Sequence, residues 1–155
     1  SNLASGTTEQ TKVLIDAGVI PMFVRFLSSE YPEIAAQVNY SFENKLVDAD
    51  LFLLQGDRGI GNISGDSVAS RDKIISYGAV DLLVKLLNRT IDESIVKQGL
   101  WALSNLCRGK PLPAFSKIYK AIEPLVNAIK TQTDMDTIAD AAWALSYISG
   151  RILFF

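Results

Sequence analysis

The chain has 155 residues, of which 48% are hydrophobic, and its 15 Lys and Arg residues against 17 Asp and Glu residues leave a net charge of −2. Such a composition is typical of one folded domain and argues against a nucleic-acid partner, while no apolar run approaches the roughly 20 residues of a membrane span. With no histidine and a single cysteine, Cys107, the chain lacks a disulfide framework and any Ser-His or Cys-His catalytic pair, so we expect no enzyme, no metal and no cofactor.

Three short amphipathic segments repeat along the chain and predict helices over 19–27, 79–87 and 121–129; the last two begin 42 residues apart. The first two follow Gly18 and Gly78, and glycine turns a sharp corner at positive φ without strain. The third copy has Lys120 at this position. A period near 40 residues is typical of stacked helical repeats.

Two longer helices are predicted over 94–107 and 137–148, again offset by 42 residues between Trp101 and Trp143. The first has an apolar face that predicts the buried side; it consists of Ile95, Leu100, Leu103 and Leu106. Cys107 lies in the same apolar stretch and is expected to be a buried free thiol in a reducing compartment. A short helix, a second helix and a long third helix together are typical of an armadillo repeat.

The long helices also carry an aromatic and amide pattern. Trp101 and Asn105 stand one helical turn apart and therefore project from one face, and Trp143 and Tyr147 repeat this spacing. Stacking would align such pairs along a concave groove, where amides hold the backbone of an extended peptide and indole faces attract Lys or Arg. The pattern predicts a peptide-binding groove; the alternative is that the tryptophans belong to the core.

Several strings resemble one family. Trp101-Ala-Leu-Ser-Asn-Leu-Cys-Arg-Gly-Lys-Pro and Trp143-Ala-Leu-Ser-Tyr-Ile-Ser are similar to successive third helices of importin alpha (karyopherin alpha), and residues 1–11 and 61–67 resemble parts of other repeats. The resemblance covers nearly all of the chain outside about 38–58 and 150–155. It implies an all-α armadillo-repeat right-handed superhelical solenoid of about three to four repeats, incomplete at both ends, in a single domain over 1–155.

The resemblance further implies a nuclear import adaptor that binds Lys/Arg-rich nuclear-localisation signals in extended form and shuttles between cytoplasm and nucleus. Its backbone clamps would be Asn2, Asn62 and Asn105. Its deepest lysine pocket would consist of Gly6, Thr11 and Asp66, with Asp66 as the counter-charge. The other groove residues that it implies are Gln37, Trp101, Arg108, Asp140, Trp143 and Tyr147.

The chain departs from the family pattern before Asn62. Asn62 and Asn105 are 43 residues apart, but Asn2 and Asn62 are 60 apart, which leaves a surplus of about 18 residues that fits 38–55. This insert is interpreted as translated intron, a lineage-specific loop, an ordinary surface loop or, around 51–54, an extension of a helix. Without it, Arg58 takes the place of a groove tryptophan, which predicts weaker binding of basic signals than in a normal importin alpha.

The second departure is the tail over 150–155, which diverges from the family. The basic segment by which the family recruits importin beta is not among these residues, so importin beta is expected to bind only through a segment absent here. The alternative function is a general armadillo scaffold for acidic or phosphorylated partners. The charge of the groove distinguishes the import adaptor from the general scaffold, because Asp66 and Asp140 favour basic peptides.

Overall fold

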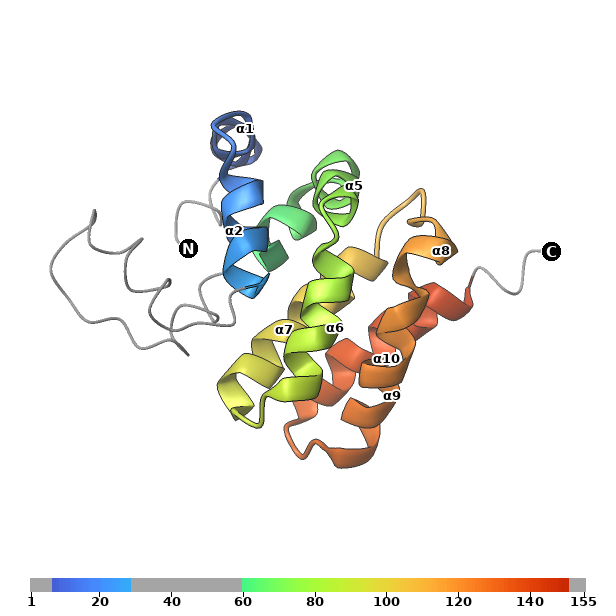
Figure 1. Ribbon diagram of the computed structural model, residues 1–155. Coiled ribbons are helices and arrows are strands. Elements are labelled where there is room, and N and C mark those ends of the chain that lie inside the picture. Colours follow the sequence, from blue (N-terminus) through green and yellow to red (C-terminus); the bar gives the residue numbers. More distant parts are fainter. Residues whose placement is uncertain (1–6, 29–59, 151–155) are drawn as a thin grey trace, which may run out of the picture.

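The computed structural model describes residues 7–28 and 60–150, and all regular secondary structure in these ranges is helical, which confirms the predicted all-α class (Figure 1). In chain order the elements are α1 (Thr8–Asp16), α2 (Val19–Ser28), a helical segment over 60–66, α5 (Val68–Ser76), α6 (Ala79–Arg89), α7 (Glu93–Cys107), α8 (Phe115–Ile118), the 3-10 helix η2 (Tyr119–Ala121), α9 (Ile122–Thr131) and α10 (Met135–Ser149). The predicted insert over 38–55 lies outside the described residues, as does the predicted tail apart from Gly150.

Two of the turns between the first and second helices of a repeat contain glycine at positive φ, as predicted. Gly18 and Gly78 both adopt φ of 80°, in the left-handed region where glycine has no steric penalty. Before α9 there is no glycine, and η2 makes the corner with tight 3-10 geometry instead. The prediction from Gly18 and Gly78 is therefore confirmed, and the copy with Lys120 uses a different turn.

The long third helices begin at acidic caps. The Asp92 carboxylate accepts hydrogen bonds from the backbone N–H groups of Ser94 and Ile95, at 2.9 and 3.1 Å. Asp134 caps α10 in the same way through the N–H of Thr137 at 2.9 Å. Each cap satisfies N–H groups that have no partner within the helix, so each fixes the start of a long helix.

The helices stack into repeats (Figure 1). α5, α6 and α7 form one repeat, and α8 with η2, α9 and α10 form the next. Between these repeats α10 packs on α7 and α6 packs on α9 and η2, while α2 of the earlier repeat packs on α6. Third helices are thereby placed beside third helices, which is the arrangement that a continuous groove requires.

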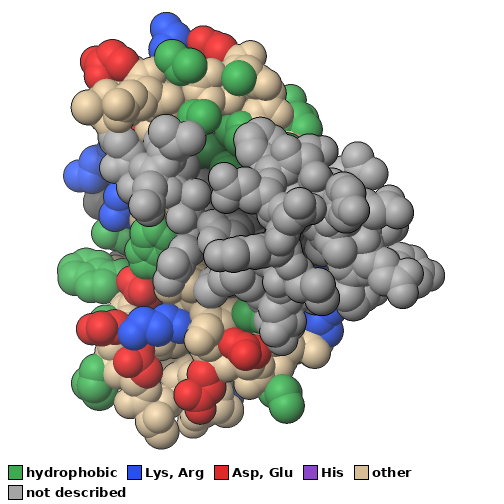
Figure 2. All heavy atoms as spheres, turned by 90° about the vertical axis from the view of Figure 1, so that its left-hand side faces the viewer, with side chains coloured by type: hydrophobic (Ala, Val, Ile, Leu, Met, Phe, Trp, Pro, Cys, Tyr) green, Lys and Arg blue, Asp and Glu red, His purple; other side chains and the backbone are tan. Residues whose placement is uncertain are grey.

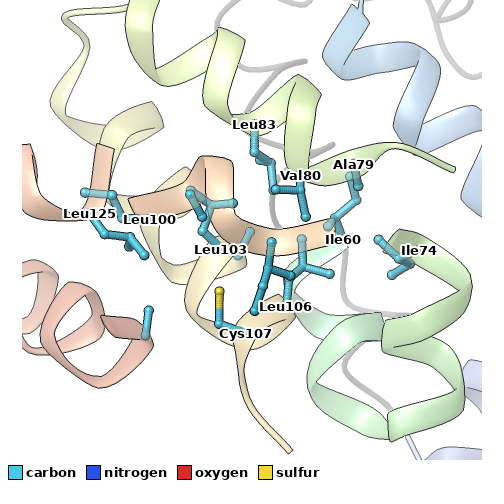
Figure 3. Packing of buried hydrophobic residues seen from close by; sticks show 14 of the residues in the cluster. Ile60, Ile74, Ala79, Val80, Leu83, Leu100, Leu103, Leu106, Cys107 and Leu125 are labelled. Atoms are coloured by element: carbon cyan, nitrogen blue, oxygen red, sulfur yellow. The ribbon is translucent and has the colours of Figure 1, made fainter. Parts of the chain in front are cut away.

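The core runs along the inner sides of these helices (Figure 3). The predicted apolar face of α7 is buried, with Ile95 and Leu100 each 1% exposed and Leu103 and Leu106 fully buried. Residues of α5, α6 and α9 complete the cluster; they include Ile74, Val80, Leu83 and Leu125. One continuous apolar cluster thus joins consecutive repeats.

Cys107 is fully buried as predicted, and burial raises the pKa of its thiol from 9.0 to about 12. Because only the thiolate attacks a disulfide reagent, this shift alone reduces the reactive fraction roughly a thousandfold at pH 8. We expect Ellman's reagent to modify Cys107 very slowly in the native chain and rapidly in urea. A Ser76→Cys variant, with the new thiol at an exposed position, provides the fast native control; equal rates at both cysteines would contradict the prediction.

Candidate peptide-binding groove

The segment over 60–66 and α7 approach each other closely at Gly61. A Cβ on Gly61 would lie 2.1 Å from Cζ3 of Trp101, so the indole occupies the space that any other residue would need for its side chain. Asn105, which is 4% exposed, donates from Nδ2 to the Gly61 carbonyl at 3.1 Å. Trp101 and Asn105 therefore lie on one face of α7, as predicted, and that face is seated on the preceding segment.

This contact bears on how Asn105 would clamp a ligand. One of its amide hydrogens already holds the Gly61 carbonyl. The amide has a second N–H and a carbonyl oxygen, but at 4% exposure the side chain of Asn105 is almost fully enclosed. Trp101 is half-buried.

Arg108 lies at the end of α7 and reaches back to the earlier segment. Its Nη2 donates to the Gly65 carbonyl at 3.2 Å, near the carboxyl end of the 60–66 segment, where a positive charge is favoured. Its own carbonyl accepts a hydrogen bond from Nη1 of Arg71 at 2.6 Å. The side chain is exposed, so it is both a link between repeats and a candidate groove residue.

The predicted lysine pocket is only partly described. Asp66 is half-buried and accepts a hydrogen bond from Oγ1 of Thr8 at 3.0 Å, which brings it against the first turn of α1. Thr11, one turn further along α1, is 1% exposed, and Asn62 is half-buried. The remaining predicted positions lie outside the described residues; they are Asn2, Gly6, Gln37 and Arg58.

On α10 the predicted residues are accessible. Trp143 is 61% exposed and its ring stacks on that of Tyr147, with centroids 6.1 Å apart and an interplanar angle of 26°. Asp140 stands one turn before Trp143 and is half-buried. Burial raises the pKa of this carboxyl, and the negative charge of Asp136 adds to the effect. The exposed Trp143 ring, stacked on the half-buried Tyr147, thus lies one turn from a carboxylate in a negative field.

The described residues contain no group of three or more His, Cys, Asp or Glu side chains placed to hold a metal ion. Across 7–28 and 60–150, none of the helices combines the length and the apolar character of a membrane span. The chemistry that this face offers is recognition: amide and carbonyl groups for a peptide backbone, and aromatic rings with carboxylates for cations.

The repeat model described as "Armadillo/beta-catenin-like repeat" matches residues 7–38, 67–108 and 118–150. The chain belongs to the armadillo-repeat family. The first match contains α1 and α2, the second contains α5 to α7, and the third contains η2, α9 and α10. The predicted armadillo solenoid is confirmed.

The resemblance of this armadillo chain to importin alpha is confirmed as well. It is 37% identical over 149 residues to importin subunit alpha-6 of Arabidopsis thaliana and 35% identical over 149 residues to importin subunit alpha-1b of Oryza sativa subsp. japonica. Each match covers 96% of this chain and 24% of the relative, so the chain spans about a quarter of their length.

Among solved structures, the armadillo chain is similar to a designed armadillo repeat protein in complex with the peptide (KR)4. The TM-score is 0.74 at 27% sequence identity, and the match covers 96% of this chain and 54% of the designed one.

Sequence reasoning did not single out four residues that shape this face: Thr8, Gly61, Arg71 and Lys97. The spacing of Gly61 and Gly65, four residues apart on one side of a helix, was a usable signal, because small residues one turn apart permit close helix contact. No comparable signal marks Thr8, Arg71 or Lys97, since charged and hydroxyl residues of this kind are common on solvated helix faces.

Proposed function

We propose that the chain is part of a nuclear import adaptor and binds basic, Lys/Arg-rich nuclear-localisation signals in extended form along the face made by the 60–66 segment, α7 and α10. The proposed partners are such signal peptides on cargo proteins, and the proposed location is shuttling between cytoplasm and nucleus. Importin alpha relatives and the designed armadillo protein bound to (KR)4 support this assignment.

The observation that carries the proposal is the exposed Trp143 ring, which stacks on the half-buried Tyr147 one turn from Asp140. A ring face attracts an ammonium or guanidinium within about 6 Å of its centroid, and a nearby carboxylate adds a charge of the right sign. The same helix face on α7 supplies Trp101 and the Asn105 amide. An acidic peptide would meet repulsion from Asp140, so this geometry favours a basic ligand.

Calorimetry with the octapeptide (KR)4 tests the proposal. We expect binding of (KR)4 and none of a Glu-rich peptide of equal length. Replacing Trp143 with alanine is expected to weaken (KR)4 binding about fivefold to tenfold, because it removes one partly exposed cation–π contact of roughly 1 kcal/mol. Since this side chain is largely exposed, the fold should persist.

Phe115→Ala is the matched control, because Phe115 is also an exposed aromatic residue, 42% exposed, but it belongs to α8 and packs with Tyr119 of η2. It should leave the dissociation constant unchanged. Preference for the Glu-rich peptide would instead establish a general scaffold for acidic partners. The candidate clamps Asn2, Asn62 and Asn105, the pocket residues Gly6, Thr11 and Asp66, and the groove residues Gln37 and Arg108 stay predictions that single substitutions in this assay can address.

A further inference from the structure

Lys97 ties α7 to the acidic start of α10. It lies one turn before Trp101, so the two side chains share a face of α7. Its ammonium is 3.0 Å from Oδ2 of Asp134 and 3.7 Å from Oδ2 of Asp136. Both ion pairs cross from the third helix of one repeat to that of the next, beside the proposed groove.

Negative charge exceeds positive charge around this lysine. Asp134, Asp136 and Asp140 lie within two turns of α10, and both Asp134 and Asp136 add to the rise in the pKa of Asp140, while Lys97 opposes it. Figure 2 shows acidic side chains gathered around a basic one on the lower half of the pictured face. The three carboxylates therefore share the charge of Lys97 and still attract further cations.

The lysine is held loosely enough to be displaced. Oδ2 of Asp134 also accepts hydrogen bonds from the N–H and the hydroxyl of Thr137, at 2.9 and 2.6 Å, so this carboxylate keeps partners without Lys97. Asp136 is 88% exposed and Lys97 is 42% exposed. Exposed ion pairs of this kind contribute little, so an incoming Lys or Arg can compete for these carboxylates.

We propose that Lys97 is an internal competitor for the basic side chains of a bound peptide, because its ammonium occupies the carboxylates of Asp134 and Asp136 beside the groove. This inference rests on the proposed function. A peptide that displaces Lys97 gains binding free energy from these carboxylates only to the extent that its own interaction with them is more favourable than that of Lys97. Because of Lys97, a peptide needs more positive charge to bind. Lys97 is therefore a specificity-determining residue.

Titration of the full chain with (KR)4 tests this. Lys97→Gln is expected to bind about threefold to fivefold more tightly than the native chain at low salt, and the gain should shrink as salt screens the exposed charges. Lys97→Arg should keep the native affinity. Lys85→Gln makes the same change of net charge at an exposed position on α6, outside the groove, and is expected to change the affinity much less.

A double-mutant cycle identifies the carboxylate. Asp136→Asn should weaken (KR)4 binding more in the Lys97→Gln chain than in the native chain, because there no lysine of the chain competes with the peptide for Asp136. The inference is overturned if Lys97→Gln binds no tighter than the native chain, or if Lys85→Gln gives the same gain. If neither the native chain nor any variant binds (KR)4, the proposed function itself fails, and this inference with it.

Discussion

Replacing Arg71 with alanine is expected to lower the free energy of unfolding by about 3 kcal/mol. Arg71 is 1% exposed, and its Nη1 donates to the Arg108 carbonyl after α7 while Nε and Nη2 hold Asp72. Gly109, at φ of 105°, makes room for it, since a Cβ there would lie 2.7 Å from Nη1. The truncation leaves a cavity and removes the donor that holds the turn after α7. Urea denaturation followed by circular dichroism measures the loss.

Two further variants separate the effect of the lost hydrogen bonds from that of the lost buried side chain. Arg71→Met keeps most of the buried stem but loses the hydrogen bonds, so we expect a smaller loss than for alanine, because an apolar side chain of similar length fills the space. Lys73→Ala, at an exposed position on the same helix, should change stability by less than about 0.5 kcal/mol. A value for Arg71→Ala as small as that for Lys73→Ala would show that the buried guanidinium does not hold the end of α7.

Replacing Gly61 with alanine is expected to destabilise the chain by about 2 kcal/mol and to move Trp101. In an ordinary helix the same change stabilises by up to about 1 kcal/mol, because glycine is a poor helix former. Here the added Cβ would lie 2.1 Å from the Trp101 ring. The steric clash therefore outweighs the gain in helix propensity, and the net effect on stability is a loss. Urea denaturation gives the stability, and fluorescence in a Trp143→Phe background reports on Trp101 alone.

Gly65→Ala is the matched control, because its Cβ would meet Arg108 and Asn105 only at ordinary contact distances of 3.5 and 3.6 Å. It should be neutral or stabilising and should leave the fluorescence unchanged. In a Trp101→Ala background the penalty for Gly61→Ala should disappear. If Gly61→Ala stabilises the native chain as Gly65→Ala does, the close contact between these two repeats is refuted.

The repeat architecture was predictable because residues of the same kind recur at equivalent positions of successive repeats. Gly18 and Gly78 mark two corners by their conformational freedom, and the Leu100, Leu103 and Leu106 spacing marks the buried face of α7. The corner without glycine was not predictable in detail, since a 3-10 turn such as η2 depends on packing of the helices on either side. Local sequence thus defines helices more readily than the turns between them.

The candidate site was predictable as a face but not as a set of contacts. The spacing of Trp101 and Asn105 placed both on one side of α7, yet nothing in that spacing indicates that the Asn105 amide holds the Gly61 carbonyl 44 residues earlier. The ion pairs of Lys97 with α10 are likewise contacts between repeats. Such contacts depend on how one repeat stacks on the next, which a pattern within a single helix does not contain.

The glycines of the 60–66 segment also have a consequence for the order of folding. Two glycines in seven residues make this helix weak by itself, at roughly 1 kcal/mol each relative to alanine. Its carbonyls at Gly61 and Gly65 are held by Asn105 and Arg108. The segment therefore depends on α7 being formed already, and structure should spread from the repeat of α7 towards the amino-terminal repeat. Opening of α7 would expose the amides of 60–66 to exchange in the same event, which makes neighbouring repeats one cooperative unit.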